Sequence, residues 1–518
     1  MPAGRYAPSP TGSLHLGNLR TALVAWLAAR ATDRAFLLRV EDLDRVRSGA
    51  EAGQRADLAA VGLDWDAEPV RQSERTALYD AAVAALRAAH GADAVYECFC
   101  SRKDIAEATS APHPRPDDGA PASLHGLPLA YKDLIDVRGM PTRFGSALLA
   151  DAPPSAQDDP LALRLRGAGT VTLGKTTVPE FGLDSYSENL VTAPARNPLD
   201  PTRTAGGSSG GAAAAVAAGI LPFAPGSDGG GSIRIPAAAC GLVGLKPGRG
   251  ELPMDEHADT VRNLTVSGPL AHTVEDAALL YDVMLTPEGL PGRVLPDLRR
   301  TVETARAGDA VDVRRIGVTT ASPFASDLEI SLARPAVTAL TKAAAALDAG
   351  GHAVEDLSPY YGEDYHRDFR TVWTAGLLRA PLPEDAEAHV GAVAAHFLRT
   401  ARAAGRAELD DAAHRLEEWA RGVRAQFAAV DVVMTPVLAT APPPVGHFLA
   451  MEPEANYEAQ CAFTPYTSMV NVLGLPAVAV PVLRDERGLN WSVQLIGRPG
   501  TSAPLLALAA HLELLLAG

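Results

Sequence analysis

Several features that mark specialised classes of protein are scarce or missing in this chain. Its 518 residues include only four cysteines, which excludes a disulfide framework and favours a reducing compartment. Residues 1–10 lack the apolar stretch of a signal peptide, and the longest run of small apolar residues is too short and too interrupted to span a bilayer. We therefore expect a soluble cytoplasmic protein without a membrane partner.

Positive charge is also in short supply. Asp and Glu together number 62, against 46 Lys and Arg, so the formal net charge is −16. This balance argues against a dedicated nucleic-acid-binding protein, and we do not expect tRNA as a partner. A hydrophobic content of 47% with 21% charged residues is typical of a globular protein, and the length predicts more than one domain.

The sequence changes character after residue 110. Residues 1–110 have the pattern of an α/β segment, and residues 111–123 (APHPRPDDGAPAS) lack periodicity, as in a linker that joins two modules. In residues 124–518 short apolar strands alternate with alanine-rich helices, which indicates α/β layering. The expected strands are 4–9, 35–40, 169–173, 316–319, 430–434 and 477–482, and the expected helices are 18–31, 49–61, 73–90 and 503–516.

The most informative stretch is residues 206–234, in which two glycine-rich turns each carry a serine. The sequences GGSSGG and GSDGGGSIR place Ser208 and Ser232 at an interval of 24 residues, with a segment of small apolar residues between them. The second serine directly follows Gly229, Gly230 and Gly231. Consecutive glycines let adjacent backbone N–H groups converge on one point, and we expect them to form an oxyanion hole.

Lys132 is the third candidate for this chemistry. It ends the apolar run LAYK, 76 residues before Ser208, in a setting consistent with burial. Two serines, a lysine and a run of glycines supply a nucleophile, a base and oxyanion donors without histidine. The plainer interpretations are a flexible Gly/Ser linker and a surface lysine beside Asp133. A linker would not continue into an apolar segment and a second glycine turn at a set interval, so we favour the catalytic interpretation.

Residues from about 124 to the C-terminus resemble the amidase signature hydrolases. Further segments recur in that family in this order: HGLPLAYKD (125–133), GKTTVPEFG (174–182), NPLDPTRTAGGSSGG (197–211), IRIPAAACGLVGLKP (233–247), GPLAHTVEDAALL (268–280), DVVMTPV (431–437) and LGLPAVAVPV (473–482). The resemblance implies an α/β fold with a mixed β-sheet core flanked by helices. After GLKPGRG the sequence does not resemble the glutamine-specific transamidase subunit, so a stand-alone amidase is favoured.

The same resemblance implies a Ser–cisSer–Lys triad. Ser232 would be the nucleophile that forms the acyl-enzyme, Ser208 the bridging serine after a cis peptide bond, and Lys132 the terminal base. To act as a base at neutral pH the lysine must be largely uncharged, and burial achieves this by lowering its pKa. The implied reaction hydrolyses a small-molecule carboxylic amide to an acid and an amine or ammonia, without a cofactor.

Residues 1–110 resemble the N-terminal part of the glutamyl-queuosine tRNA(Asp) synthetases. APSPTGSLHLGN at 7–18 matches the class I HIGH motif, and RVEDLD at 39–44 follows at that family's spacing. The resemblance implies a truncated Rossmann half-domain with an ATP-facing turn formed by His15, Gly17 and Asn18. It also implies a glutamate site formed by Arg5, Ser9 and Glu41. The plain alternative is an ordinary turn histidine among turn-forming glycines.

The parts that would complete a synthetase are missing. Class I adenylation needs a second, lysine-bearing loop, yet none of the five lysines stands in a K-[ML]-S-[KR] context. Cys98 and Cys100 resemble half of a zinc site, but a closed site needs four ligands, so we interpret them as reduced cysteines and expect no metal. Cys240, among alanines, is interpreted as a small core residue rather than a nucleophile.

Three functions follow from these observations. The favoured one is the amidase. The alternatives are an ATP-dependent glutamyl-Q tRNA(Asp) synthetase, for which ATP and zinc would be needed, and an inactive chimera of two parent folds. The sequence does not indicate an oligomeric state.

One exchange assay separates the synthetase from the other two. Adenylation needs positive charge on both sides of the phosphate that is attacked, and the HIGH-like half supplies one side only. We expect no glutamate-dependent ATP–pyrophosphate exchange and no stoichiometric zinc in the purified protein. Measurable exchange that is abolished by His15→Ala would restore the synthetase hypothesis.

Overall fold

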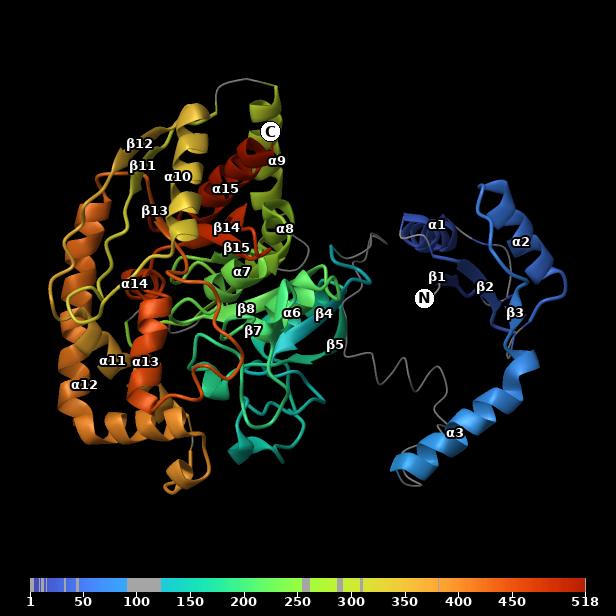
Figure 1. Ribbon diagram of the computed structural model, residues 1–518, viewed down its shortest axis with the longest axis horizontal. Helices are drawn as coiled ribbons and strands as arrows, with labels where there is room; N and C mark the ends of the chain where they lie inside the picture. The colour runs from blue at the N-terminus through green and yellow to red at the C-terminus, as the bar shows by residue number, and fades with distance from the viewer. Residues whose placement is uncertain are drawn as a thin grey trace. The chain divides into compact units, whose positions relative to one another are not determined.

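The computed structural model describes residues 4–8, 10, 14, 16–31, 34–42, 46–90, 123–253, 261–286, 292–307, 311–380 and 382–517. The chain divides into two compact units, residues 1–111 and residues 112–518, which we describe separately (Figure 1). The predicted site residues that lie outside the described residues are Ser9, His15, Cys98 and Cys100.

Among its described residues, the first unit contains a small parallel sheet and three α-helices. Its strands, in the order β1 (Gly4–Tyr6), β2 (Phe36–Val40) and β3 (Val70–Arg71), are joined through α1 (Leu16–Ala31) and α2 (Ala50–Ala60), and α3 (Thr76–His90) follows. The core is formed mainly by Phe36 and Leu38 of the sheet with Ala22 and Ala29 of α1 and Leu58 of α2. Both expected strands and the three expected helices of this segment are confirmed, with ends that move by one to three residues.

The second unit is built around an eight-stranded mixed sheet in the order β12-β11-β13-β15-β14-β9-β10-β8. β12, β11 and β13 run parallel, and the other neighbours pair antiparallel. The strands are β8 (Phe223–Asp228), β9 (Val243–Lys246), β10 (Val266–Ala271), β11 (Arg315–Val318), β12 (Ala353–Asp356), β13 (Val432–Pro436), β14 (Ala477–Arg484) and β15 (Asn490–Ile496). Two short sheets pair β4 (Pro128–Lys132) with β5 (Val171–Thr176) and β6 (Arg196–Asn197) with β7 (Asp200–Thr204).

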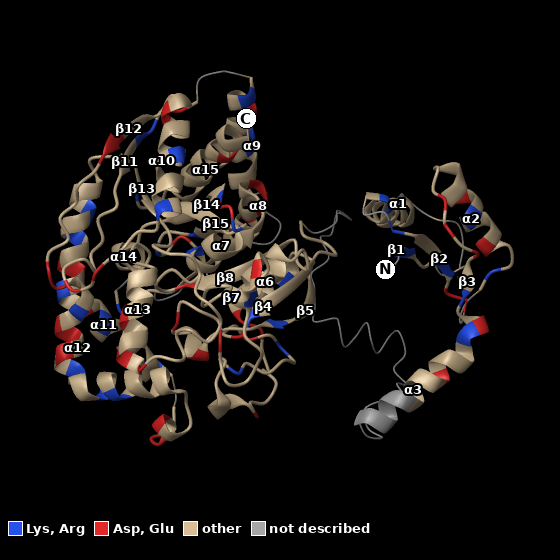
Figure 2. Ribbon diagram, in the orientation of Figure 1, with Lys and Arg blue, Asp and Glu red and all other residues tan. Residues whose placement is uncertain are grey.

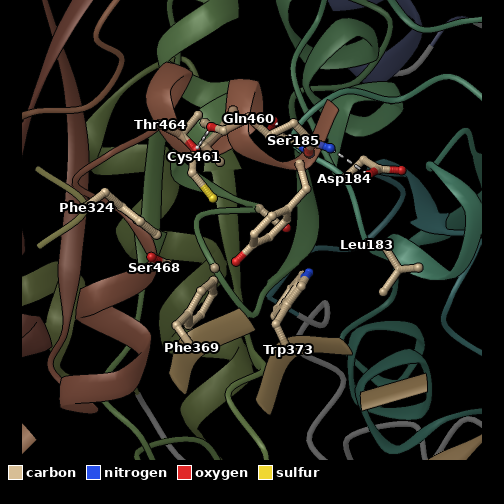
Figure 3. A pocket seen from close by; sticks show the side chains of 14 residues that line it. Leu183, Asp184, Ser185, Phe324, Phe369, Trp373, Gln460, Cys461, Thr464 and Ser468 are labelled. Carbon is tan, nitrogen blue, oxygen red and sulfur yellow. Dashed lines mark hydrogen bonds between the residues drawn. The ribbon is translucent and has the colours of Figure 1, made fainter. Parts of the chain in front are cut away.

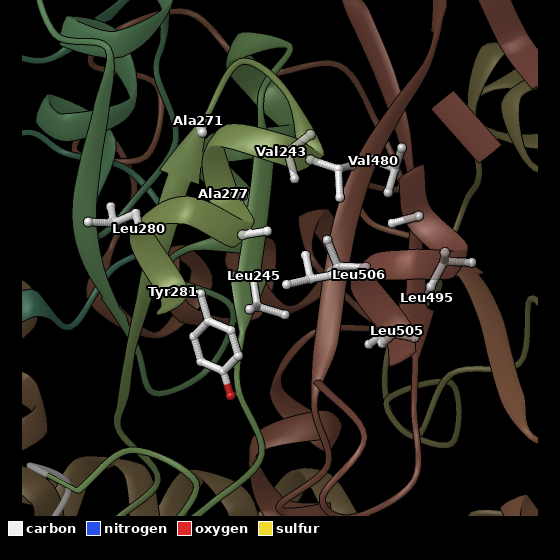
Figure 4. Packing of buried hydrophobic residues seen from close by; sticks show 14 of the residues in the cluster. Val243, Leu245, Ala271, Ala277, Leu280, Tyr281, Val480, Leu495, Leu505 and Leu506 are labelled. Carbon is white, nitrogen blue, oxygen red and sulfur yellow. The ribbon is translucent and has the colours of Figure 1, made fainter. Parts of the chain in front are cut away.

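Helices cover both faces of the large sheet. Successive residues of a strand point to opposite faces, so apolar residues that follow one another need a packing partner on each face. Val478 and Val480 of β14 pack in one core with α8, α10 and α15, and Ala477 packs in another with α12 and α14. Figure 4 shows the first core, where Leu245 of β9 lies near Tyr281 of α8 and Leu506 of α15. The helices are α5 (Pro160–Gly167), α6 (Gly210–Ala217), α7 (Arg234–Cys240), α8 (Val274–Leu285), α9 (Val294–Arg306), α10 (Arg334–Ala349), α11 (Tyr365–Ala375), α12 (Ala392–Phe427), α13 (Pro453–Phe463), α14 (Ser468–Leu473) and α15 (Ser502–Ala517).

Charged side chains are frequent on the outer helix α12. Figure 2 shows Lys, Arg, Asp and Glu along α12, whereas the central strands are almost entirely uncharged. The predicted strands of this unit appear as β5, β11, β13 and β14, and the predicted last helix appears as α15. In the described part of the chain no helix is both long and apolar enough to cross a membrane.

A buried ion pair joins three elements next to the second glycine turn. The carboxylate of Asp228, at the end of β8, accepts hydrogen bonds from Nε and Nη2 of Arg234 on α7, both at 2.9 Å. Both side chains are fully buried. Asn471 of α14 accepts from Arg234 Nη2 at 2.6 Å and donates to the Asp228 carbonyl oxygen at 2.7 Å. The pair therefore locks β8, α7 and α14 together.

Removing one charge of this pair should destabilise the fold strongly. Asp228→Asn leaves the Arg234 guanidinium buried without its counter-charge, so we expect the free energy of unfolding to fall by about 3–5 kcal/mol. Urea denaturation followed by circular dichroism measures this change.

The matched control is Asp297→Asn on α9, because Asp297 pairs with Arg300 at 3.2 Å while both side chains are more than half exposed. We expect a change below about 0.5 kcal/mol there. If the free energy of unfolding fell by the same small amount in both variants, the buried pair would not be what holds the second glycine turn in place.

Candidate active site

Lys132 lies at the end of β4 in a fully buried position surrounded by oxygen atoms. Its Nζ is 2.6 Å from Ser208 Oγ, 3.0 Å from Ser227 Oγ and 3.1 Å from the Ser227 carbonyl oxygen. The peptide bond between Gly207 and Ser208 is cis. The structure thus brings together the predicted lysine and the first predicted serine, which are 76 residues apart in the chain.

The surroundings of Lys132 favour its uncharged form. Burial lowers the pKa of the ammonium group to about 7, because the charged form loses its hydration, while the negative charge of Asp228 acts in the opposite direction. A substantial fraction of Lys132 is therefore neutral near pH 7. In that form the nitrogen has two hydrogens to donate and one lone pair with which to accept a proton.

Ser232 sits between two residues that are anchored to the same carboxylate. The Gly231 N–H donates to Asp228 Oδ1 at 2.7 Å, and the Ile233 N–H donates to Asp228 Oδ2 at 3.1 Å. Burial alone would raise the pKa of Asp228, but the charge and hydrogen bonds of Arg234 outweigh it and hold the pKa well below its usual range. The carboxylate is therefore always charged, and it fixes the backbone on both sides of Ser232.

The predicted oxyanion hole needs a correction at Gly231. Its N–H is already engaged with Asp228, and it is thus not a free donor as the sequence suggested. The position still requires glycine, because its φ is +128° and a Cβ would lie 2.4 Å from Thr467 Oγ1. Gly229 and Gly230 each line a cavity beside Ser232.

Two cavities meet at Ser232, which is 6% exposed. The first, here called the aromatic cavity, measures about 50 Å³ and is lined by Leu183, Asp184, Ser185, Gly230, Ser232, Ile235, Phe324, Phe369, Trp373, Tyr457, Gln460, Cys461, Thr464 and Ser468 (Figure 3). The second, here called the larger cavity, measures about 230 Å³. Besides Ser232, its lining includes Ser208, Ser227, Gly229, Arg262 and Arg379. Both predicted serines therefore border the larger cavity.

Sequence reasoning missed several residues of this site. The partners of Lys132 include Ser227, which precedes Asp228 in β8. Asp228 and Arg234 flank the glycines of the second turn, and an acidic and a basic residue on either side of GGGS were the available signal. Nothing in the sequence pattern indicates Asn471, which arrives from α14.

The other predicted residues lie as follows. In the first unit Arg5 lies in β1, Gly17 and Asn18 lie in the first turn of α1, and Glu41 follows β2. The carboxylate of Glu41 pairs with Arg39 and is therefore already engaged. Cys240 is buried on α7, and burial raises the pKa of its thiol well above the usual range, so its interpretation as a core residue is confirmed.

Comparisons with known proteins show to which family the chain belongs. A family model described as Amidase matches residues 80–506, and a model described as tRNA synthetases class I (E and Q), catalytic domain, matches residues 3–117. The putative amidase AmiB2 of Mycobacterium tuberculosis is 38% identical over 411 residues, which cover 79% of this chain and 85% of that protein. An acylamidase of Rhodococcus erythropolis is 33% identical over 396 residues, with coverages of 75% and 81%.

The fold has solved counterparts. The structure of a 6-aminohexanoate cyclic dimer hydrolase superposes with a TM-score of 0.69 at 27% identity, covering 84% of this chain and 97% of that one. A crystal structure described as an amidase superposes with a TM-score of 0.60 at 28% identity, with coverages of 77% and 86%. The chain therefore belongs to the amidase family and carries, at its N-terminal end, a segment that matches the catalytic domain of class I tRNA synthetases.

Proposed function

We propose that this protein hydrolyses the amide bond of a small molecule through an acyl-enzyme on Ser232. The observation that carries the proposal is the buried contact of 2.6 Å between Lys132 Nζ and Ser208 Oγ, at a cavity that Ser232 also lines. A buried amine with a lowered pKa beside a hydroxyl is the arrangement that general-base activation of a serine requires. Relatives described as amidases and an acylamidase support the same reaction class.

In the acylation step, neutral Lys132 accepts the proton of the Ser208 hydroxyl. Ser208 Oγ takes up the proton of Ser232, and Ser232 Oγ attacks the amide carbonyl carbon. The C–N bond then breaks, and the proton returns through Ser208 to the leaving nitrogen, so that an ester on Ser232 remains. In the second step a water molecule passes a proton along the same path to Lys132 and attacks the ester carbonyl carbon. The bond between that carbon and Ser232 Oγ then breaks, and the proton returns through Ser208 to Ser232 Oγ, which releases the acid and restores the serine.

Backbone N–H groups of the glycine turn would stabilise the oxyanion in both steps. Because Gly231 donates to Asp228, we assign this role to the N–H groups of Gly229, Gly230 and Ser232. Lys132, Ser208 and Ser232 supply every proton-transfer and nucleophilic group, so the reaction requires no cofactor. We further propose a cytoplasmic location, in keeping with the low cysteine content.

A fluorophosphonate probe tests the nucleophile. We expect covalent labelling at Ser232, located by peptide mapping, and no labelling of Ser232→Ala. The control is Ser209→Ala, which removes the neighbouring buried hydroxyl of the first glycine turn and should still be labelled at Ser232. Labelling at another residue, or equal labelling of Ser232→Ala, would refute the assignment.

The pH dependence of hydrolysis tests the base. With a pKa of about 7, Lys132 is protonated at lower pH and cannot accept a proton, so kcat/KM should fall below pH 7 by about tenfold per unit. Lys132→Met should lower kcat by about 10²–10⁴-fold.

Lys342→Met is the matched control for this experiment, and its profile should match that of the wild type. Within the part of the chain that the structure describes, Lys342 on α10 donates only to the Val482 carbonyl oxygen. Near-normal turnover of Lys132→Met, or a flat profile between pH 5.5 and 8.5, would contradict the lysine-base mechanism.

A further inference from the structure

The aromatic cavity beside Ser232 combines a buried carboxylate with several aromatic rings. Asp184 is only 6% exposed, and it lines the cavity together with Phe369, Trp373 and Tyr457 (Figure 3). Phe369 and Trp373 stack with ring centroids 5.8 Å apart. A carboxylate and the faces of aromatic rings are the two groups that bind organic cations in proteins.

Asp184 has no cationic partner among the described residues. Its Oδ1 accepts a hydrogen bond from Gln460 Nε2 at 2.8 Å, a neutral donor. Burial, with smaller contributions from the nearby carboxylates of Glu180 and Glu188, raises the pKa of Asp184 to about 7, against the hydrogen bonds from Gln460 and Tyr186. The carboxyl group of Asp184 in the cavity wall therefore lacks a positively charged partner among the described residues.

Arg370 is a positively charged residue near this wall, and its guanidinium group already has a carboxylate partner. The Arg370 guanidinium lies 5.7 Å from the centroid of the Tyr457 ring, and it forms an ion pair with Glu454. The Tyr457 hydroxyl, by contrast, is buried and finds no oxygen or nitrogen partner among the described residues, which leaves it with the weakly bonding thiol of Cys461. A ligand that donates hydrogen bonds would satisfy both this hydroxyl and Asp184.

The larger cavity differs in charge and in position. It is lined by Arg262, which forms an ion pair with Asp410 at 2.5 Å, and by Arg379, which has no carboxylate partner among the described residues, so the positive charge of Arg379 disfavours a cation there. It is also the cavity that Ser208 lines, and Ser208 must return a proton to the leaving nitrogen. The leaving amine therefore belongs in the larger cavity, and the acyl chain belongs in the aromatic cavity.

We propose that the aromatic cavity binds a protonated amino group on the acyl part of the substrate, with Asp184 as its counter-charge. The substrates of this class are amides of short amino acids. The cavity volume of about 50 Å³ fits a short aminoalkyl chain. This inference rests on the proposed amidase function, and Asp184 acts in it as a specificity-determining residue.

Three amides of equal length test the inference. In 4-aminobutanamide an ammonium group replaces the terminal methyl of pentanamide, and in glutaramic acid a carboxylate replaces it. We expect kcat/KM, measured by ammonia release, to be roughly tenfold or more higher for 4-aminobutanamide than for pentanamide, and lowest for glutaramic acid. Hydrolysis of pentanamide without a preference for the ammonium substrate would overturn the inference and leave the amidase function intact.

Two isosteric variants assign the preference to Asp184. Asp184→Asn retains an oxygen that accepts from Gln460, and it should reduce the ratio of kcat/KM between the ammonium and methyl substrates to about one. Glu188→Gln neutralises a neighbouring carboxylate that accepts from the Gly446 N–H and does not line the cavity. Because the charge of Glu188 raises the pKa of Asp184, this variant should keep the preference for the ammonium substrate and should not lower the ratio. Equal ratios in wild type and Asp184→Asn would contradict the assignment.

A binding measurement covers the case in which none of the three amides turns over. Butylammonium should slow fluorophosphonate labelling of Ser232 in the wild type at concentrations where butan-1-ol has no effect, and this protection should be lost in Asp184→Asn. Absence of protection by butylammonium would overturn the inference. Absence of labelling at Ser232 would instead contradict the proposed function.

Discussion

The buried ion pair between Asp228 and Arg234 is the interaction on which the site depends. Two fully desolvated charges are costly, and here hydrogen bonds from Gly231, Ile233 and Asn471 offset that cost. The same carboxylate that satisfies Arg234 holds the residues before and after Ser232. The serine is consequently presented to both cavities by a turn that has little freedom to move. The pair thus connects packing energy in the core with the position of Ser232, the proposed nucleophile.

A second consequence of burial is chemical. Lys132 lies in the same fold interior, but it has no carboxylate in contact, only the oxygen atoms of Ser208 and Ser227. Arg234 has a carboxylate in contact, whereas Lys132 has only neutral oxygens beside it and loses much of its charge through burial. One interior therefore produces a permanent cation that supports structure and a neutral amine that is suited to accept protons.

The sequence predicted those features of the protein that depend on residues close to one another in the chain. Short apolar runs indicated β11, β13 and β14 to within two residues, and the glycine turns pointed to Ser208 and Ser232 as candidate site residues. What escaped were contacts between distant segments, such as Arg234 with Asn471 and Asp184 with Gln460, because no periodicity links residues more than 200 positions apart. The hydrogen bond from the Gly231 N–H to Asp228 was not predicted for a related reason. A run of glycines shows that backbone N–H groups can converge, but it does not show which acceptor each N–H group bonds to.

The central claim is that burial makes Lys132 a neutral base near pH 7. Titration of the protein labelled with ¹³C at lysine Cε, followed by NMR, measures this directly, and five lysines give a simple spectrum. Lys246 is also buried, and desolvation followed by the charge of Arg234 lowers its pKa to about 7, so Lys132→Met is needed to assign the resonance. The account predicts that the Lys132 signal titrates with a midpoint near 7. A midpoint at the ordinary value for lysine, near 10.5, would contradict it.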